Sequence, residues 1–231
     1  MDRRTLPETE REASARLLSL AAHELRTPVS VVGGYLRMLQ RDETLNERQR
    51  KMIDEADKAC ARLVAIIKEV SEVGKLDDGR TRLQSEGLDL FGLLRDIAGS
   101  VDEASDRGVR LALHGCDVAA TIRGDRLHLR DTFTALMRAV LREQHDEAVV
   151  RVDCQLHADR VLIVIGRSDR LDSVLKQPRA PFDDQRGGLG LMLPIARRVI
   201  EGHGGTIWSP ADAEGKTTAR SAVLVELPTN T

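Results

Sequence analysis

The sequence contains few cysteines. Its three cysteines, Cys60, Cys116 and Cys154, are odd in number and include no closely spaced pair. This pattern favours a reducing compartment and argues against a disulfide framework or a zinc site. We therefore expect three free thiols in a cytoplasmic protein, and no metal centre.

The sequence also lacks a dominant charge and any long apolar run. Its 35 basic and 37 acidic residues nearly balance, so bulk charge gives no reason to expect a nucleic acid as a partner. No apolar run approaches the roughly 20 residues that span a bilayer, and residues 1–17 lack the hydrophobic core of a signal peptide. With 41% hydrophobic and 31% charged residues, the chain is expected to be globular and to have no membrane segment.

What the sequence does contain is two long segments with helical periodicity. In each segment apolar residues recur at steps of three and four, which places them on one stripe of an α-helix. Two such helices joined by a short loop form an antiparallel hairpin, and these stripes are wider than one partner helix covers. We therefore expect a homodimer through residues 12–73, built as a four-helix bundle. The stripes comprise Leu18, Ala22, Leu25, Val29, Val32, Leu36 and Leu39 in the first segment, and Leu45, Met52, Ala56, Ala59, Leu63, Ile66, Val70 and Val73 in the second.

The rest of the chain mixes helix and strand signals. Residues 77–84 are mostly polar and include a glycine, which is typical of a linker. The expected fold class is α+β, with a helical hairpin over residues 1–76 and an α/β sandwich over residues 85–231, in which helices cover one face of a mixed sheet. The expected helices begin after Asp89, near Asp125 and near residue 191; the expected strands cover 109–115, 148–156, 161–166 and the last two apolar segments.

Two motifs resemble those of a known family. The stretch HELRTP at residues 23–28 resembles the H box of bacterial sensor histidine kinases. The stretch PIARRVIEGHGGTI at residues 194–207, with VELP near the end of the chain, resembles the end of their ATP-binding domain. The resemblance implies a dimeric helical bundle that carries a phosphorylatable histidine. It also implies a following α/β sandwich of the ATPase type shared with gyrase and Hsp90-type proteins.

The residues of the H box fit a phosphoacceptor on their own terms. His23 lies off the apolar stripe, so its imidazole is expected to face outward, where a phosphoryl donor can reach it. Glu24 is a carboxylate able to orient the other ring nitrogen, and Thr27 lies one helical turn further on the same face. Pro28 has no N–H and crowds the carbonyl of Glu24, so we expect a kink below the histidine. The expected catalytic residues are His23, Glu24 and Thr27.

The ATP half departs from the family pattern at the metal site. Family members carry asparagines that ligate the magnesium of Mg-ATP, on a helix that opens with Gly-Asp. Counting from Gly124 and Asp125 places Ala135 and Ala139 at those positions. Magnesium requires oxygen ligands, which a methyl group does not supply.

The adenine position is also altered. The family has a strand that ends in D-x-G-x-G, whose aspartate binds the adenine amino group. Here either Arg167 or, with a two-residue slip, Asp169 takes the aspartate position, and neither register restores the glycines. An arginine presents hydrogen-bond donors to the adenine amino group, which is itself a donor. A buried polar group without a hydrogen-bond partner weakens binding.

The glycine-rich loop is incomplete in the same way. Counting back from PIARRVIEGHGG places Gly188, Gly190 and Met192 at the three glycine positions of the family. Met192 then occupies a position where backbone must approach phosphate closely, and its side chain obstructs that approach. The sequence therefore predicts that no cofactor is bound in this half of the chain.

Three functions remain open. In the first, the chain is a phosphorelay carrier that takes a phosphoryl group onto His23 from one receiver-domain aspartate and passes it to another. The magnesium then comes from the receiver of a response regulator, and a hybrid kinase is one possible upstream source. In the second, the chain is a divergent but active histidine kinase that uses ATP. In the third, it is a binding module that sequesters or positions a regulator or a kinase without carrying phosphate.

Overall fold

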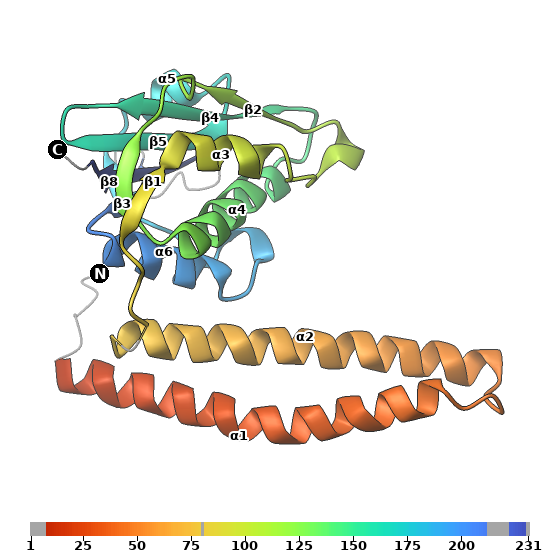
Figure 1. The fold of residues 1–231 in the computed structure, drawn as a ribbon. Coiled ribbons are helices and arrows are strands. Elements are labelled where there is room, and N and C mark those ends of the chain that lie inside the picture. Colours follow the sequence, from red (N-terminus) through yellow and green to blue (C-terminus); the bar gives the residue numbers. More distant parts are fainter. Residues whose placement is uncertain (1–7, 80, 212–221, 230–231) are drawn as a thin grey trace. The chain divides into compact units, whose positions relative to one another are not determined.

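A computed structural model describes residues 8–79, 81–211 and 222–229 (Figure 1). The chain divides into two compact units, a helical unit over residues 1–81 and an α/β unit over residues 82–231. Among the residues described, no helix is both long enough and apolar enough to cross a bilayer.

The helical unit is an antiparallel hairpin of α1 (Glu8–Gln40) and α2 (Glu47–Asp77). A capping box begins α2, because the Asn46 side chain accepts a hydrogen bond from the Gln49 N–H at 2.9 Å and the Gln49 side chain accepts one from the Asn46 N–H at 3.0 Å. Pro28 lies inside α1, which continues through it without a break. Figure 1 shows α1 bowed along its length rather than sharply bent.

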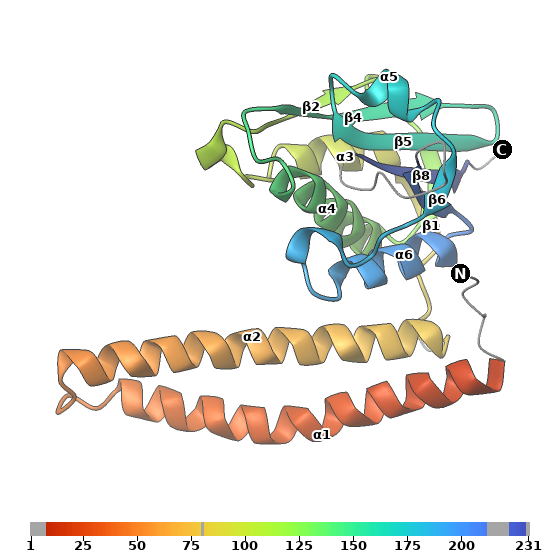
Figure 2. The same ribbon diagram turned by 180° about the vertical axis from the view of Figure 1, so that it is seen from behind.

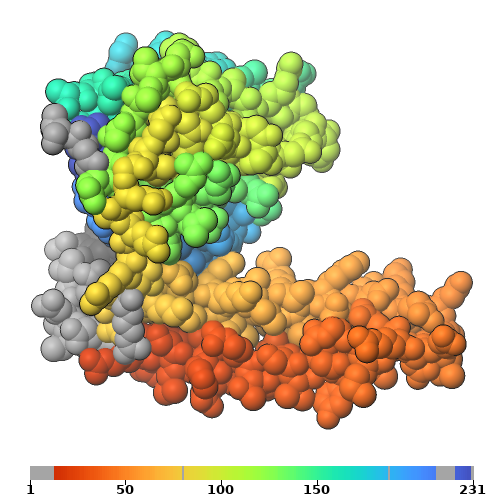
Figure 3. Space-filling model, viewed as in Figure 1, coloured from red at the N-terminus to blue at the C-terminus, as the bar shows by residue number. Residues whose placement is uncertain are grey.

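Small residues let the two helices approach each other closely. Ala15 and Ala22 of α1 and Cys60 of α2 are buried in this hairpin. A Cβ added at Gly74 would lie 2.8 Å from the Ser19 hydroxyl and 2.9 Å from the Ala15 carbonyl oxygen, so only glycine fits there. The space-filling view shows the side chains of α1 and α2 in contact along the hairpin (Figure 3).

The α/β unit is built on a six-stranded mixed sheet in the order β2-β4-β5-β8-β7-β6. β2 and β4 are parallel, and every other neighbouring pair is antiparallel. A separate two-stranded ribbon pairs β1 with β3. The strands are β1 (Glu86–Asp89), β2 (Arg110–His114), β3 (Thr121–Gly124), β4 (Val149–Leu156), β5 (Arg160–Arg167), β6 (Arg179–Pro181), β7 (Thr206–Pro210) and β8 (Ala222–Pro228). The helices of this unit are α3 (Leu90–Ala98), α4 (Arg126–Arg142), α5 (Leu171–Val174) and α6 (Met192–Gly202), with single 3₁₀ turns η1 (Ser105–Arg107) and η2 (Arg186–Gly188).

The two faces of the large sheet are covered differently. Figures 1 and 2 show α3, α4 and α6 on one face and α5 on the other. Alternation along β5 matches this arrangement, because Val161, Ile163 and Ile165 are fully buried on the face with the three helices. On the opposite face a smaller cluster joins the sheet to α5; it comprises Val164, Leu171, Val174, Trp208, Ala222 and Leu224.

The expected α+β fold, a helical hairpin followed by a sandwich, is confirmed. Three short strands, β1, β3 and β6, and the single-turn helix α5 were not anticipated. The second helix ends at Asp77, four residues later than the apolar stripe indicates.

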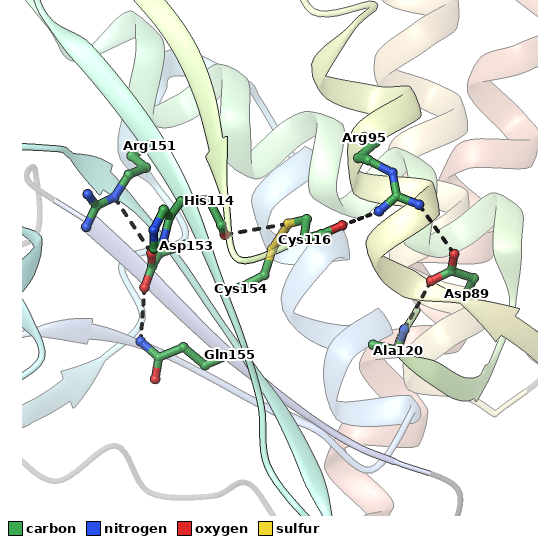
Figure 4. Close-up of a disulfide and its surroundings, with 9 residues drawn as sticks. All are labelled: Asp89, Arg95, His114, Cys116, Ala120, Arg151, Asp153, Cys154 and Gln155. Carbon is green, nitrogen blue, oxygen red and sulfur yellow. Dashed lines mark hydrogen bonds and ion pairs between the residues drawn. A yellow bond between two sulfur atoms is a disulfide. The ribbon is translucent and has the colours of Figure 1, made fainter. Parts of the chain in front are cut away.

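The expectation of three free thiols is wrong. Cys116 and Cys154 form a disulfide with a Cα–Cα distance of 5.6 Å (Figure 4). The free cysteine is Cys60, which is buried. Parallel pairing of β2 with β4 brings the residues just after β2 beside Cys154. Gly115 makes the turn at φ 74°, where a Cβ would collide with the Cys154 carbonyl oxygen. Spacing along the sequence does not reveal this pairing, because the two cysteines are 38 residues apart.

Candidate functional site

His23 is displayed on the surface of the helical unit. Its side chain is 72% exposed, which confirms the outward orientation predicted from the helical phase. Nδ1 of His23 lies 3.5 Å from Oε1 of Glu24, whose side chain is equally exposed. With a carboxylate near Nδ1, the opposite nitrogen Nε2 is the one available as a nucleophile. Thr27, one turn further along α1, is exposed as well.

The apolar stripes of the hairpin divide into a covered and an uncovered part. In α2, the residues that face α1 include the buried Cys60 and Ile67. The stripe residues Met52 and Leu63 lie on another side of α2 and are 61% and 51% exposed. In α1, Ala22 is buried, whereas Leu18, Leu25, Val32 and Leu39 are exposed. One hairpin therefore leaves a broad apolar surface open to solvent, and surfaces of this kind mark interaction sites.

In the α/β unit, the predicted metal positions are buried rather than open. Asp125 is the N-cap of α4, as expected from the Gly-Asp motif, and its side chain accepts hydrogen bonds from the Leu127 and His128 N–H groups. Ala135 and Ala139 are 4% and 0% exposed. Spacings of four residues place them on one ridge of α4, and the next position along that ridge is Glu143.

Glu143 forms a buried ion pair with Arg186. Nε of Arg186 donates to Oε1 of Glu143 at 2.9 Å, and Nη2 donates to Oε2. Nη1 donates to the Ala222 carbonyl oxygen at 2.9 Å. The Arg186 side chain is 1% exposed and that of Glu143 is 8% exposed, so this is an interior pair with two parallel hydrogen bonds.

The two candidate adenine partners bind each other. At the end of β5, Nε and Nη2 of Arg167 donate to the two carboxylate oxygens of Asp169, each at 3.1 Å. The hydrogen bond from the Arg167 guanidinium lowers the pKa of Asp169. Both residues are thus engaged in a local, partly exposed ion pair.

The remnant of the glycine-rich loop precedes α6. Gly188 and Gly190 adopt positive φ values of 60° and 63°, which glycine tolerates best. Met192 is the first residue of α6 and is half-buried. Its N–H donates to the Leu189 carbonyl oxygen at 3.3 Å, so this backbone donor is already engaged within the loop.

The histidine of the GHGG motif, His203, makes two hydrogen bonds that link parts of the fold. Nδ1 of His203, in the GHGG stretch, lies 2.6 Å from the Val199 carbonyl oxygen. Nε2 of the same ring accepts a hydrogen bond from the Asp125 N–H at 2.9 Å. One imidazole therefore joins the end of α6 to the start of α4, and this contact requires the tautomer with hydrogen on Nδ1.

Asp125 is expected to give the α/β unit a pH-dependent stability. Burial raises its pKa, but hydrogen bonds from the backbone N–H groups of His128 and Gln84, together with the His128 side chain, outweigh burial and hold the pKa at about 2, below the ordinary 3.8. Because the folded pKa is depressed, the stabilisation is complete above about pH 4 and is lost as the pH falls toward 2. The difference corresponds to about 2 kcal/mol of unfolding free energy.

Replacing Asp125 with asparagine should therefore lower the unfolding free energy by about 2 kcal/mol at neutral pH, and the loss should shrink between about pH 4 and pH 2. Urea titrations followed by the fluorescence of Trp208, the only tryptophan, measure this difference. The exposed Asp117→Asn variant serves as the control. A loss of stability for Asp125→Asn that stays constant down to the lowest pH would contradict the assignment.

No group of three or more His, Cys, Asp or Glu side chains suited to a metal ion occurs in the part of the chain that the structure describes.

The relatives of the chain are signalling proteins. Residues 13–79 match the model of the His Kinase A (phospho-acceptor) domain. Over 214 residues the chain is 30% identical to the sensor histidine kinase GacS of Pseudomonas protegens, a match that covers 84% of this chain and 23% of GacS. The chain spans 22% to 36% of the length of the first curated relatives that it matches.

Solved structures share the fold. Full-length ShkA in complex with AMPPNP has a TM-score of 0.73 and 21% identity, over 94% of this chain and 46% of that chain. Histidine kinase ThkA in complex with the response regulator protein TrrA has a TM-score of 0.57 and 19% identity, over 99% of this chain and 68% of that chain. Fold and phospho-acceptor domain define a protein of two-component signal transduction. The chain belongs to the sensor histidine kinase family.

Two residue pairs of the α/β unit join positions that lie far apart along the chain and are not predictable from local sequence. Arg186 and Glu143 are 43 residues apart, and Asp125 and His203 are 78 apart. One signal for the first pair was available, because Glu143 continues the buried ridge of Ala135 and Ala139. An acidic side chain on such a ridge requires a cation.

Proposed function

We propose that this chain is a histidine phosphotransferase of two-component signalling. It carries a phosphoryl group on His23 and exchanges it with receiver-domain aspartates of response regulators, and it does not phosphorylate itself from ATP. The observation that supports this most strongly is the contrast between the two units. The H box is complete and His23 is exposed, whereas α4 presents two buried alanines where metal ligands are expected, and a buried ion pair follows at Glu143, the C-cap residue.

The transfer needs only one nucleophile from this chain. Nε2 of His23 attacks the phosphorus of a receiver aspartyl phosphate, so that an N–P bond forms and the bond from phosphorus to the aspartate oxygen breaks. The carboxylate leaves, and Glu24 stabilises the positive charge that develops on the ring through Nδ1. Return of the phosphoryl group to a second receiver reverses these steps. Magnesium and its carboxylate ligands belong to the receiver.

The proposed working form is a homodimer through residues 12–73. The exposed leucines of the stripes support it, because pairing two hairpins would bury them in a four-helix bundle. ThkA, which has the same fold, has been solved with a response regulator, and this supports a receiver domain as the partner here.

The test is transfer of labelled phosphate to the purified protein, from ATP in one reaction and from a phosphorylated receiver domain in another. We expect acid-labile labelling only from the receiver, and none for His23→Gln, which keeps the helix propensity of an exposed position. Glu24→Ala should slow the transfer without removing the acceptor, and Thr27→Ala should chiefly alter hydrolysis of phosphate, if the protein has such an activity. The exposed His157→Gln variant should be labelled like the wild type.

Each alternative function predicts a different result. Labelling of the wild type from ATP that His23→Gln abolishes would identify an active kinase. If His23→Gln still accepts label, or still signals normally in cells, the phosphotransfer proposal fails. A protein that binds the receiver and is never labelled would be a binding module.

Nucleotide binding provides a separate check. The expected losses of metal ligand, adenine partner and phosphate-binding glycine cost about 1–3 kcal/mol each, which together exhaust the roughly 8 kcal/mol of a micromolar site. We therefore expect calorimetry to detect no Mg-ATP binding tighter than millimolar. A micromolar constant would overturn this part of the proposal.

A further inference from the structure

We propose that Arg186 is an internal occupant that closes the nucleotide site of the α/β unit. The inference rests on the proposed function, because that function assigns the site to α4 and the loop before α6. It goes beyond that function, because the nucleotide site would not only lack metal and phosphate ligands but would also be filled by the Arg186 side chain.

The geometry of α4 is the first step. Glu143 is the C-cap residue of α4 and keeps a helical backbone conformation, so it extends by four residues the ridge on which Ala135 and Ala139 occupy the expected metal positions. Arg186 reaches this ridge from the opposite wall, since it lies only two residues before Gly188. The ion pair therefore connects the two walls between which a nucleotide would have to lie.

Several contacts hold the segment around Arg186 in place. Besides Glu143, the Arg186 guanidinium binds the Ala222 carbonyl oxygen at the start of β8. Two residues earlier, Oδ2 of Asp184 forms an ion pair with Nη1 of Arg197 in α6, at 3.0 Å. The segment 184–186 is thus tied to α4, β8 and α6, and it can withdraw from α4 only if a buried guanidinium loses its carboxylate.

The ion pair of Arg186 competes with binding of a nucleotide phosphate. All three guanidinium nitrogens, Nε, Nη1 and Nη2, already donate hydrogen bonds, and the side chain is almost completely buried. Breaking a buried ion pair is strongly unfavourable, because both charges lose their partner in an environment that water does not reach. An incoming phosphate would have to bear that cost. Restoring the expected metal ligands, adenine partner and glycine would therefore not by itself recreate a nucleotide site.

The experiment compares three proteins by calorimetry with Mg-ATP. They are the wild type, the restored variant Ala135→Asn/Ala139→Asn/Arg167→Asp/Met192→Gly, and the restored variant that also carries Glu143→Leu and Arg186→Met. Replacing both partners avoids leaving either charge buried alone. We expect binding only in the last protein, at least about tenfold tighter than in the restored variant.

The outcomes separate the two proposals. Tight binding of Mg-ATP by the wild type would overturn both the proposed loss of ATP binding and the proposal that Arg186 closes the nucleotide site. Tight binding by the restored variant with Arg186 in place would overturn only the proposal that Arg186 closes the nucleotide site. A six-substitution variant with native circular dichroism that does not bind would likewise overturn the proposal for Arg186.

A second measurement applies if a restored variant does not fold. In nuclear magnetic resonance spectra of the wild type, the Arg186 Nε–H signal is assigned as the one that Arg186→Lys removes. We expect this proton to exchange with solvent far more slowly than those of exposed arginines, and millimolar Mg-ATP to leave its exchange unchanged. Exchange at the rate of an exposed arginine would overturn the inference.

Discussion

Replacing Arg186 with methionine is expected to lower the unfolding free energy of the α/β unit by about 3–5 kcal/mol, because the Glu143 carboxylate would remain buried without a cation. Replacing both partners, Arg186→Met with Glu143→Leu, should cost much less than the single change. Urea unfolding followed by Trp208 fluorescence reports on this unit, since the only tryptophan lies in β7.

An exposed ion pair provides the matched control. Arg110 lies 3.7 Å from Glu147, and both side chains are more than 75% exposed. Arg110→Met is expected to change the unfolding free energy by less than about 1 kcal/mol. If Arg186→Met were no more destabilising than Arg110→Met, the pair between Arg186 and Glu143 would not hold the loop to α4.

Substituting Leu63 with aspartate is expected to convert the homodimer into a monomer. Leu63 is 51% exposed in a single hairpin and lies in the apolar stripe of α2. A symmetric dimer would bury two carboxylates for each such substitution, which is expected to weaken association by at least about a hundredfold. Light scattering at micromolar concentration measures the change.

Ala65→Asp is the control for this prediction. Ala65 is exposed, and two residues further along α2 its side chain points to a different side of the helix. It should leave the dimer intact. A wild type that is already monomeric, or an aspartate at position 63 that leaves the dimer unchanged, would contradict the proposed interface.

Features that depend on neighbouring residues were predictable from the sequence. The spacing of apolar residues, such as Leu18 and Leu25 in the first segment and Leu63 in the second, predicts two amphipathic helices. The phase of the first stripe places His23 outside it. The N-cap at Asp125 and the apolar run of β5 likewise follow from local pattern. Short elements such as β1 and β3 have too few residues for a period to be recognised.

Features that depend on distant residues were not predictable. Cys116 meets Cys154 only because β2 pairs with β4, and that choice of neighbour is a property of the whole sheet. Arg186 and Glu143 meet for a comparable reason, since the loop before α6 folds onto α4. For the candidate site, the sequence predicts a lack of ligands at Ala135, Ala139 and Met192, but it does not reveal that Arg186 pairs with Glu143.

The bond between Cys116 and Cys154 also has a topological meaning. It closes residues 116–154 into a covalent ring that contains β3, all of α4 and most of β4. The ridge of Ala135, Ala139 and Glu143 thus lies within a closed loop of chain, whereas Arg186 approaches it from outside that loop. A single cleavage of the backbone inside the ring opens the loop without releasing a fragment. While the disulfide is intact, both halves of a chain cut in this way stay covalently joined as one molecule.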